Sequence, residues 1–265
     1  MQNKLIVIRG AGDVASGTAH RLVRSGFPVV MIELPEPLVV RRTVSFAEAV
    51  FRGKCTVEDI TAELAVTTGD IHKLLSAGKI PIVANPNQYP LKELRPAAVI
   101  DATLAKKNIG TTINDAPIVI GLGPGFTAGV DVHAIVETQR GHNLGKVILQ
   151  GQAEPNTGIP GEISGYREER VLRAPGSGTF LAVKEIGASV QKGELVATIA
   201  HLPLQATIPG VIRGMLHNNL KVTPGMKVGD IDARHMKEYC YTISDKARAI
   251  AGGVLEAYLF LRRRL

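Results

Sequence analysis

Short apolar runs alternate with amphipathic segments over the first half of the chain. Uninterrupted apolar runs are typical of strands buried on both faces, and they occur at 4–9, 28–33, 79–84, 97–101 and 117–121. Apolar residues at helical spacing predict helices over 13–25, 46–51 and 70–77. This alternation predicts an α/β fold with a Rossmann-like, mostly parallel sheet over residues 1–125.

The pattern changes after Gly125, where short apolar stretches punctuated by Gly and Pro predict a β-rich module over 126–240. Two half-repeats at 175–233, each with a glycine, an apolar strand and a second glycine-containing turn, resemble those of biotinyl/lipoyl-type barrel-sandwich modules. Carrier domains of that type present a lysine between the two halves, and the connector 198–207 has none. We therefore expect a barrel-sandwich-like module that carries neither biotin nor lipoate.

An apolar stripe at helical spacing predicts a closing helix over 244–265, docked on the first domain. Ser244 suits the N-cap position of this helix. Gly252 and Gly253 lower the helix propensity, so we expect them to mark a close approach to another backbone. A bulky side chain at Gly252 is therefore expected to overpack the interface.

The most informative motif is the glycine-rich turn between the first predicted strand and the first predicted helix. Gly10 and Gly12 allow a sharp turn that brings backbone N–H groups near an anion. Asp13 follows in the same turn, and the small Ala15 permits close packing of helix on strand. Glu33 ends the second strand, 21 residues beyond Gly12, where an acidic side chain would accept hydrogen bonds from ribose hydroxyls. The motif favours a loop that faces a nucleotide or phosphate; a structural turn is the alternative.

Further candidates follow other predicted strands. Gly121, Gly123 and Gly125 make a bare backbone surface that suits an anion or, alternatively, a plain turn between domains. Asp101 ends the fourth strand, where open α/β sheets place their ligands, and Lys106 could neutralise a phosphate. The predicted ligand-binding residues are Gly10, Gly12, Asp13, Ala15, Glu33, Arg41, Asp101, Lys106, Gly121, Gly123 and Gly125.

Composition narrows the classes of function. The net charge is +7, but the 4% aromatic content without tryptophan argues against stacking platforms for single-stranded nucleic acid. No apolar stretch is long enough to span a bilayer, and no signal peptide precedes the first strand. Two cysteines far apart in the sequence indicate a reducing cytosol. We expect a cytoplasmic protein that binds neither nucleic acid nor membrane.

Few residues suggest catalysis or metal binding. Cys55 follows Arg52 and Lys54, whose charge would favour a thiolate able to handle sulfur or selenium, although a buried, inert cysteine is the commoner outcome. His133 and His142 match no compact metal signature, so no metal site is predicted. Whether the chain catalyses a reaction stays open.

Several longer motifs resemble the YqeB-type proteins. They are Arg41–Ala49, Asp101–Asn108, Gly121–Phe126, Glu137–Gly145 and Asn156–Gly161, and they extend the resemblance over nearly the whole chain. That family is named for selenium-dependent molybdenum hydroxylase systems and is related to the XdhC accessory factors. No residue role is carried over, because the family's own catalytic residues are poorly established.

The resemblance implies an accessory protein that helps to mature or insert the molybdenum cofactor. It implies a molybdopterin-type cofactor or dinucleotide as ligand, and a molybdenum hydroxylase apoenzyme with its cofactor-maturation proteins as partners; homo-oligomerisation stays open. One alternative is a NAD-dependent oxidoreductase, since Glu33 would suit an unphosphorylated ribose, although no Tyr-x-x-x-Lys motif accompanies it. The other is a non-catalytic scaffold that docks a hydroxylase or a sulfurtransferase.

Overall fold

The chain forms two compact units, each discontinuous in sequence. The computed structural model describes residues 4–85 and 91–264. Among these, unit 1 holds the residues up to Pro37, 45–156 and those from Ile243 onward. Unit 2 holds 38–44 and 157–242. The seven residues 38–44 therefore leave unit 1, contribute to unit 2 and return.

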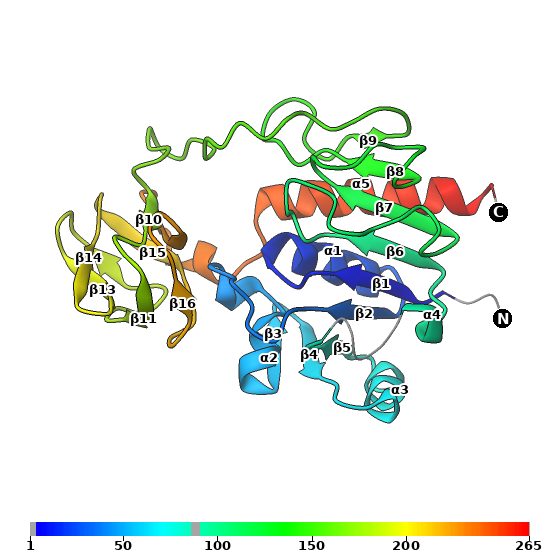
Figure 1. Cartoon of the computed structure of the whole chain (residues 1–265), viewed down its shortest axis with the longest axis horizontal. Coiled ribbons are helices and arrows are strands. Elements are labelled where there is room, and N and C mark those ends of the chain that lie inside the picture. Colours follow the sequence, from blue (N-terminus) through cyan, green and yellow to red (C-terminus); the bar gives the residue numbers. More distant parts are fainter. Residues whose placement is uncertain (1–3, 86–90, 265) are drawn as a thin grey trace. The chain divides into compact units, whose positions relative to one another are not determined.

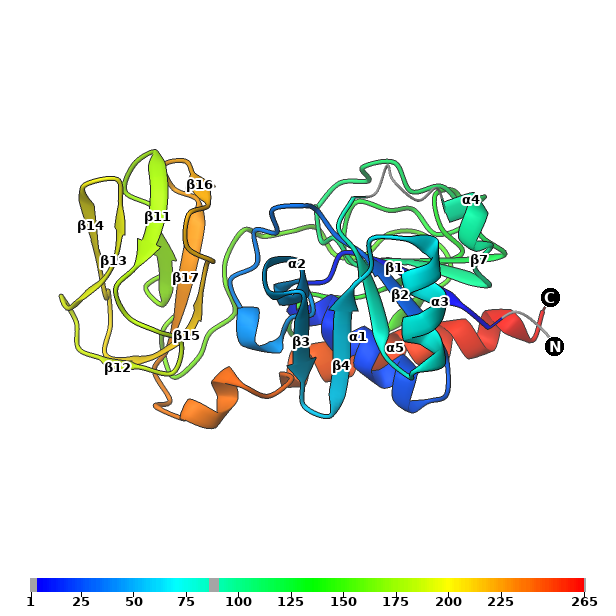
Figure 2. The ribbon, with the colours of Figure 1, turned by 90° about the horizontal axis from the view of Figure 1, so that it is seen from below.

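Unit 1 is built on one mixed sheet of nine strands in the order β3-β4-β5-β2-β1-β6-β7-β8-β9 (Figure 1). Its strands are β1 (Ile6–Arg9), β2 (Val29–Ile32), β3 (Lys54–Val57), β4 (Ile60–Leu64), β5 (Ile80–Val83), β6 (Ala98–Asp101), β7 (Ile118–Leu122), β8 (Ala134–Val136) and β9 (Val147–Ile148). From β4 to β8 every neighbouring pair is parallel. The strands β3 and β9 pair antiparallel at the two edges, and Figure 2 shows β3 and β4 side by side as a hairpin.

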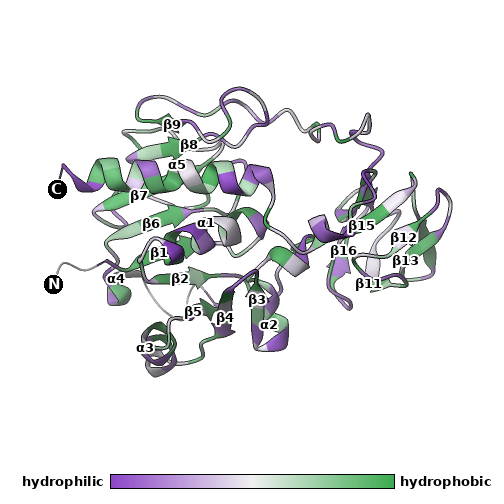
Figure 3. Ribbon diagram, turned by 180° about the vertical axis from the view of Figure 1, so that it is seen from behind, coloured by the Kyte–Doolittle hydropathy of each residue, from purple (hydrophilic) through white to green (hydrophobic). Residues whose placement is uncertain are grey.

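Two long helices cover one face of this sheet. The helices of unit 1 are α1 (Asp13–Arg24), α2 (Glu48–Arg52), α3 (Thr68–Ser76), α4 (Leu91–Leu94) and α5 (Asp245–Arg262). α1 and α5 lie side by side against the sheet (Figure 3), and each buries apolar residues, among them Leu22 of α1 and Val254 of α5. The rings of Phe27 and Tyr258 meet edge to face at 5.0 Å between centroids. No helix in the described part of the chain is both long and apolar enough to cross a membrane.

The central strands are apolar because both of their faces are covered. All residues of β2, β5, β6 and β7 are buried. Burial on both faces removes the need for alternating polar positions, which is why these strands read as continuous apolar runs in the sequence. The five strands and three helices predicted for the first half of the chain are found within two residues at each end.

Helix α5 approaches the β8–β9 connection through one of its two adjacent glycines. A Cβ on Gly253 would lie 2.1 Å from the carbonyl oxygen of Gly145, so only glycine fits there. A Cβ on Gly252 would meet no atom within 4 Å. The expectation that Gly252 marks the close approach is therefore wrong, because successive helical residues point in directions about 100° apart and only Gly253 faces the backbone.

Unit 2 consists of two four-stranded antiparallel sheets, in the orders β10-β17-β15-β12 and β14-β13-β11-β16. Its strands are β10 (Val171–Arg173), β11 (Gly178–Ala182), β12 (Ser189–Val190), β13 (Leu195–Ile199), β14 (Leu202–Gln205), β15 (Gly210–Met215), β16 (Lys221–Val222) and β17 (Lys227–Asp232). The segment 38–44 joins the unit because the Met215 N–H donates to the Val40 carbonyl at 2.8 Å. The short 3-10 helix η2 (Lys237–Cys240) precedes the return to unit 1.

The predicted fold class, a Rossmann-like mostly parallel sheet plus a barrel-sandwich module, is wrong. The first sheet is mixed, with an antiparallel strand at each edge, and no helix connects β6 to β7 or β7 to β8. The second unit is a pair of separate antiparallel sheets. The prediction failed at the edges because a half-exposed edge strand carries too few apolar residues to be recognised as a strand.

The domain limits also differ from those expected at 125 and 126–240. Residues 126–156 lie in unit 1, because β8 and β9 extend its sheet. Their Gly-rich connections resemble those of a β module, which is why the sequence pattern assigned them to the second domain.

Substitution of the two α5 glycines tests the packing of this helix. Gly253→Ala is expected to lower the free energy of unfolding by about 1–3 kcal/mol, because the new methyl group overlaps the Gly145 carbonyl. Gly252→Ala is the matched control and is expected to raise that free energy by up to about 1 kcal/mol through better helix propensity. Chemical denaturation measures both, and equal stability of the two variants would contradict the close approach.

Candidate functional site

The predicted ligand-binding residues of unit 1 gather where its parallel strands end, here called the carboxyl edge. Arg9, the last residue of β1, pairs in register with Ile32 on one side and Asp101 on the other. Asp101 in turn pairs with Gly121. The turns that follow β1, β2, β6 and β7 therefore begin at the same level of the sheet. Open α/β sheets bind their ligands at this edge.

The first glycine turn is held by a carboxylate of the chain itself. Glu33 accepts the Ala11 N–H on Oε2 and the Leu34 N–H on Oε1, both at 2.7 Å. Burial raises the pKa of Glu33, and these two amide hydrogen bonds act in the opposite direction. Each oxygen of Glu33 thus has a main-chain partner. These hydrogen bonds fix the turn after β1, which gives Glu33 a structural role. The predicted hydrogen bond to a ribose stays a prediction.

Two glycines bring the loop after β6 into close contact with the turns on either side of it. A Cβ on Gly10 would lie 3.0 Å from the Ala102 carbonyl oxygen, and one on Gly125 would lie 2.7 Å from the Lys107 Cα. Both glycines have positive φ, +90° and +109°, which other residues rarely adopt. The loop 102–117 is therefore packed between the β1 and β7 turns.

The remaining predicted glycines serve the same packing. A Cβ on Gly121 would overlap the Phe126 ring at 2.5 Å, and one on Gly123 would overlap the Thr138 hydroxyl. These contacts explain the glycine-rich sequence between β7 and Phe126 without a ligand. The Gly123 amide is itself engaged, since its N–H donates to the Val136 carbonyl at 2.9 Å.

Side-chain hydrogen bonds fix the loop 102–117 to the sheet. The buried Asp101 accepts the Thr103 hydroxyl at 2.7 Å on Oδ1 and the Thr111 hydroxyl at 2.5 Å on Oδ2. Arg9 donates to the Thr111 hydroxyl as well and forms an ion pair with Asp115 at 3.0 Å. The sequence predicted Asp101 as a ligand contact, whereas its carboxylate is engaged within the chain.

Lys106 and Lys107 occupy the exposed part of this loop. The backbone of Lys106 has φ +63° and that of Leu104 has φ +54°, both in the left-handed region. Such conformations cost about 1–3 kcal/mol in residues other than glycine and concentrate at ligand-binding and catalytic sites. The loop therefore holds two lysines in a fixed but strained backbone at the carboxyl edge.

Helix α1 begins at the same edge. Gly12 is its N-cap residue and supplies no side-chain cap, Asp13 lies in the first turn, and Ala15 is buried. The positive end of the helix dipole favours negative charge at this position.

Lys246, in the first turn of α5, is a neighbour of this helix start that the sequence analysis missed. Burial lowers the pKa of Lys246, while the negative charge of Asp13 acts in the opposite direction. A lysine in the first turn of a helix is unusual, since the helix dipole favours cations at the C-terminal end. The position of Lys246 in the predicted helix was therefore a signal that the sequence offered.

Two predicted residues are not part of the carboxyl edge of unit 1. Arg41 belongs to unit 2, where its Nη2 donates to the main-chain carbonyls of Tyr239 at 2.9 Å and Thr242 at 3.4 Å. Cys55 lies in β3, and its Sγ donates to the Phe46 carbonyl at 3.5 Å. Burial raises the pKa of Cys55 to about 11, so at neutral pH the thiol stays protonated and is a poor nucleophile.

One group of side chains in the described part of the chain has the donor types of a metal site. His20 Nε2 lies 2.7 Å from Asp59 Oδ1 and 3.5 Å from Glu58 Oε2. Glu58 Oε1 also accepts the Ile243 N–H at 3.0 Å and an Arg248 guanidinium N–H at 2.6 Å. These bonds tie α1, the β3–β4 turn and α5 together, which accounts for the group without an ion.

Comparison with known proteins gives one clear relative. No protein-family model matches the chain. The uncharacterized protein YqeB of Escherichia coli K12 is 49% identical over 259 residues, which make up 98% of this chain and 48% of YqeB. The chain is related to YqeB. It spans about half the length of that relative, and the resemblance predicted from the motifs is confirmed to this extent; nothing in it concerns selenium or molybdenum.

Solved structures show distant likenesses. An aspartoacylase family protein from Mesorhizobium loti, 12% identical, aligns over 86% of this chain and 84% of its own with a TM-score of 0.30. A succinylglutamate desuccinylase/aspartoacylase from Rhodobacter sphaeroides, 15% identical, aligns over 86% and 85% with a TM-score of 0.28. Likenesses at this level carry no argument for a shared reaction.

The function predicted from the sequence is corrected here, because none of the similar proteins is named for molybdenum cofactor maturation. The aligned structures are named as aspartoacylase and succinylglutamate desuccinylase proteins, not as factors of molybdenum cofactor maturation. The accessory role for a molybdenum hydroxylase is therefore withdrawn, with its alternatives of an oxidoreductase and a scaffold. The molybdopterin-type and NAD ligands, the hydroxylase partner and the cytoplasmic location are untested and stay predictions.

Alkylation tests the environment of Cys55. Its pKa near 11, against an ordinary value of 9.0, leaves about 100-fold less thiolate at pH 8, so iodoacetamide is expected to modify it about 100-fold more slowly than in the unfolded chain. Peptide mass spectrometry in buffer and in urea measures both rates. Equal rates in the two conditions would show a reactive cysteine.

Proposed function

We propose that unit 1 binds a small anion, a phosphate or a carboxylate, at the carboxyl edge of its sheet. Lys106 and Lys107 supply positive charge, and the first turn of α1 supplies backbone N–H donors. The observation that carries the proposal is the strained, doubly anchored loop 102–117, which the chain holds between two glycine turns with its lysines exposed.

Electrostatics support an anion at this position. The uncapped start of α1 presents the positive end of its dipole, and backbone amides at a helix start are ready donors to phosphate or carboxylate oxygens. Lys246 lies close enough to Asp13 in the first turn of α1 for the two charges to interact. Because the backbone of the loop is already fixed, the entropy lost on binding is mainly the rotamer entropy of the lysine side chains.

The state of Glu33 argues for a compact ligand. Its two oxygens already accept main-chain N–H groups, and the Ala11 amide of the glycine turn is one of those donors. A ligand that binds through one or two negatively charged groups requires no hydrogen bond to the Glu33 oxygens and none from the Ala11 N–H. The proposal therefore names small phosphates and dicarboxylates as the ligand class.

Titration with pyrophosphate tests this proposal. Isothermal titration calorimetry at low ionic strength is expected to show saturable binding, which Lys106→Gln combined with Lys107→Gln weakens about tenfold or more, because two charge-assisted contacts are lost. Succinate, titrated in parallel, distinguishes a carboxylate ligand from a phosphate.

The matched control is Lys73→Gln, which removes an exposed lysine from the last turn of α3, just before β5 begins at the opposite edge of the sheet. This variant is expected to bind as tightly as the unmodified chain. The carboxyl edge is not the site if neither anion binds, or if the Lys106→Gln/Lys107→Gln double variant and the Lys73→Gln control bind with equal affinity.

A further inference from the structure

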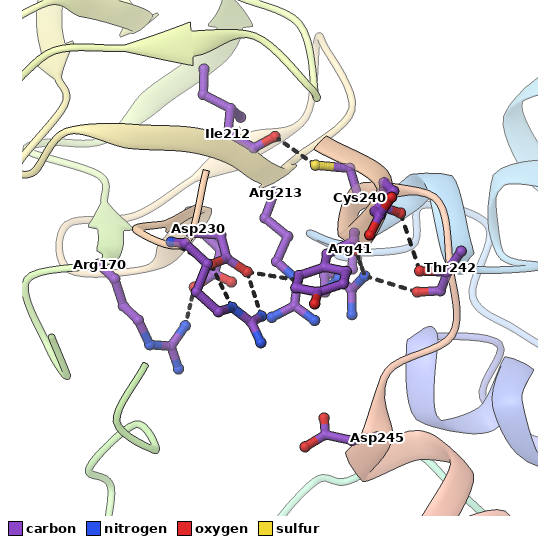
Figure 4. A network of polar contacts seen from close by, with 12 residues as sticks. Arg41, Arg170, Ile212, Arg213, Asp230, Cys240, Thr242 and Asp245 are labelled. Carbon is purple, nitrogen blue, oxygen red and sulfur yellow. Dashed lines mark hydrogen bonds and ion pairs between the residues drawn. The ribbon is translucent and has the colours of Figure 1, made fainter. Parts of the chain in front are cut away.

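The strongest unexplained feature outside this site is a set of arginines in unit 2. Four arginines surround two buried aspartates; the cluster comprises Arg41, Arg170, Arg213, Arg234, Asp230 and Asp232 (Figure 4). Arg41 comes from the segment 38–44, Arg213 from β15 and the two aspartates from β17. Arg170 immediately precedes β10, and Arg234 follows β17. Burying charged groups is costly unless they are paired and hydrogen-bonded, so each member of the cluster requires a partner.

Two of the arginines hold the aspartates at short range. Arg170 Nη1 donates to Asp230 Oδ1 at 2.5 Å. Arg234 donates to Asp232 through Nε at 2.9 Å and Nη2 at 2.6 Å, and its guanidinium stacks 4.5 Å from the centre of the Tyr239 ring. The carboxylate oxygens are therefore taken up mainly by Arg170 and Arg234.

The Nε of Arg213 has no hydrogen-bond partner in the part of the chain that the structure describes. Arg213 lies in the fully buried strand β15 and is 6% exposed. Its Nε forms an ion pair with Asp232 Oδ2 at 3.6 Å, but this buried Nε finds no hydrogen-bond acceptor among the described residues. A guanidinium offers five N–H donors, and a buried donor without an acceptor costs about 1–3 kcal/mol.

Arg41 adds a second cation beside Arg213. Its Nη2 is anchored by the carbonyls of Tyr239 and Thr242, and Figure 4 shows both guanidinium groups directed toward the same region. Burial lowers the pKa of Arg213, and the neighbouring charge of Arg41 lowers it further. Two like charges held together in a buried place are stabilised most directly by an anion between them.

We propose that unit 2 binds a small oxyanion, held by the guanidinium groups of Arg213 and Arg41. The planar fork of an arginine matches two oxygens of a phosphate, sulfate or carboxylate, and two arginines together match the charge of a divalent tetrahedral oxyanion. The site is separate from the carboxyl edge of unit 1 and does not depend on it.

Thermal unfolding with added inorganic phosphate tests the site. The full chain carrying Lys106→Gln and Lys107→Gln is used throughout, so that binding at the other proposed site does not contribute. With phosphate at about ten times its dissociation constant, Tm is expected to rise by roughly 3–6 °C. Arms with sulfate and with acetate distinguish a tetrahedral oxyanion from a carboxylate.

Arg213→Met is the decisive variant. It removes an unsatisfied buried cation, so its Tm without added anion is expected to equal or exceed that of the parent, while the phosphate shift disappears. Arg213→Lys keeps the charge but loses the fork, and is expected to weaken the phosphate response at least tenfold in concentration. If Arg213→Met fails to fold, the phosphate response of Arg213→Lys tests the proposal in its place.

Arg173→Gln is the matched control in the same unit. Arg173 is an exposed residue of β10 whose Nη1 donates to the Gly225 carbonyl at 3.0 Å, and its removal is expected to leave the phosphate shift unchanged. The proposal is overturned if no anion raises Tm, or if the Arg213 variants respond to phosphate as the parent does.

Discussion

Close backbone packing at the carboxyl edge of the nine-stranded sheet is the constraint on which the proposed site depends. Gly10 and Gly125 have no Cβ because the loop 102–117 passes within 3.0 Å of where those atoms would lie. The Asp101 carboxylate further restrains the packed loop, because it accepts hydrogen bonds from the hydroxyls of Thr103 and Thr111. The exposed lysines owe their location to these buried contacts.

The two units differ in how their charged groups are paired, and this contrast separates structural roles from a role in binding. In unit 1, each carboxylate oxygen of Asp101 and Glu33 accepts a hydrogen bond from an N–H or O–H group of the chain, so the observed roles of these residues are structural. The buried Nε of Arg213 in unit 2 has no such partner among residues 4–85 and 91–264. Because native proteins rarely leave a buried polar group unpaired, the exception indicates a group that the chain alone does not supply.

The sequence predicted the central strands and α1 because continuous apolar runs and helical spacing are local properties. It also placed Gly10, Glu33, Asp101 and Gly121 at the ends of predicted strands, and the parallel pairing brings these ends to one edge. The β3–β4 hairpin was missed because its edge strand is largely exposed and its turn contains no glycine.

Other failures arose from contacts between residues distant in sequence. The crossing of 38–44 into unit 2 rests on pairing with Met215, far along the chain. The choice between Gly252 and Gly253 depends on where the Gly145 carbonyl lies. The arginine cluster had one local signal, an arginine inside the buried strand Gly210–Met215, but its partners could be recognised only after folding.

The central claim is that an anion binds at the carboxyl edge of unit 1, and amide NMR locates such binding directly. Uniformly labelled protein carrying Arg213→Met is titrated with pyrophosphate, so that the second proposed site is silent. The account predicts saturable shifts of the backbone amides of residues 10–13 and 103–107. Shifts confined to other parts of the chain, or an unchanged spectrum, would contradict it.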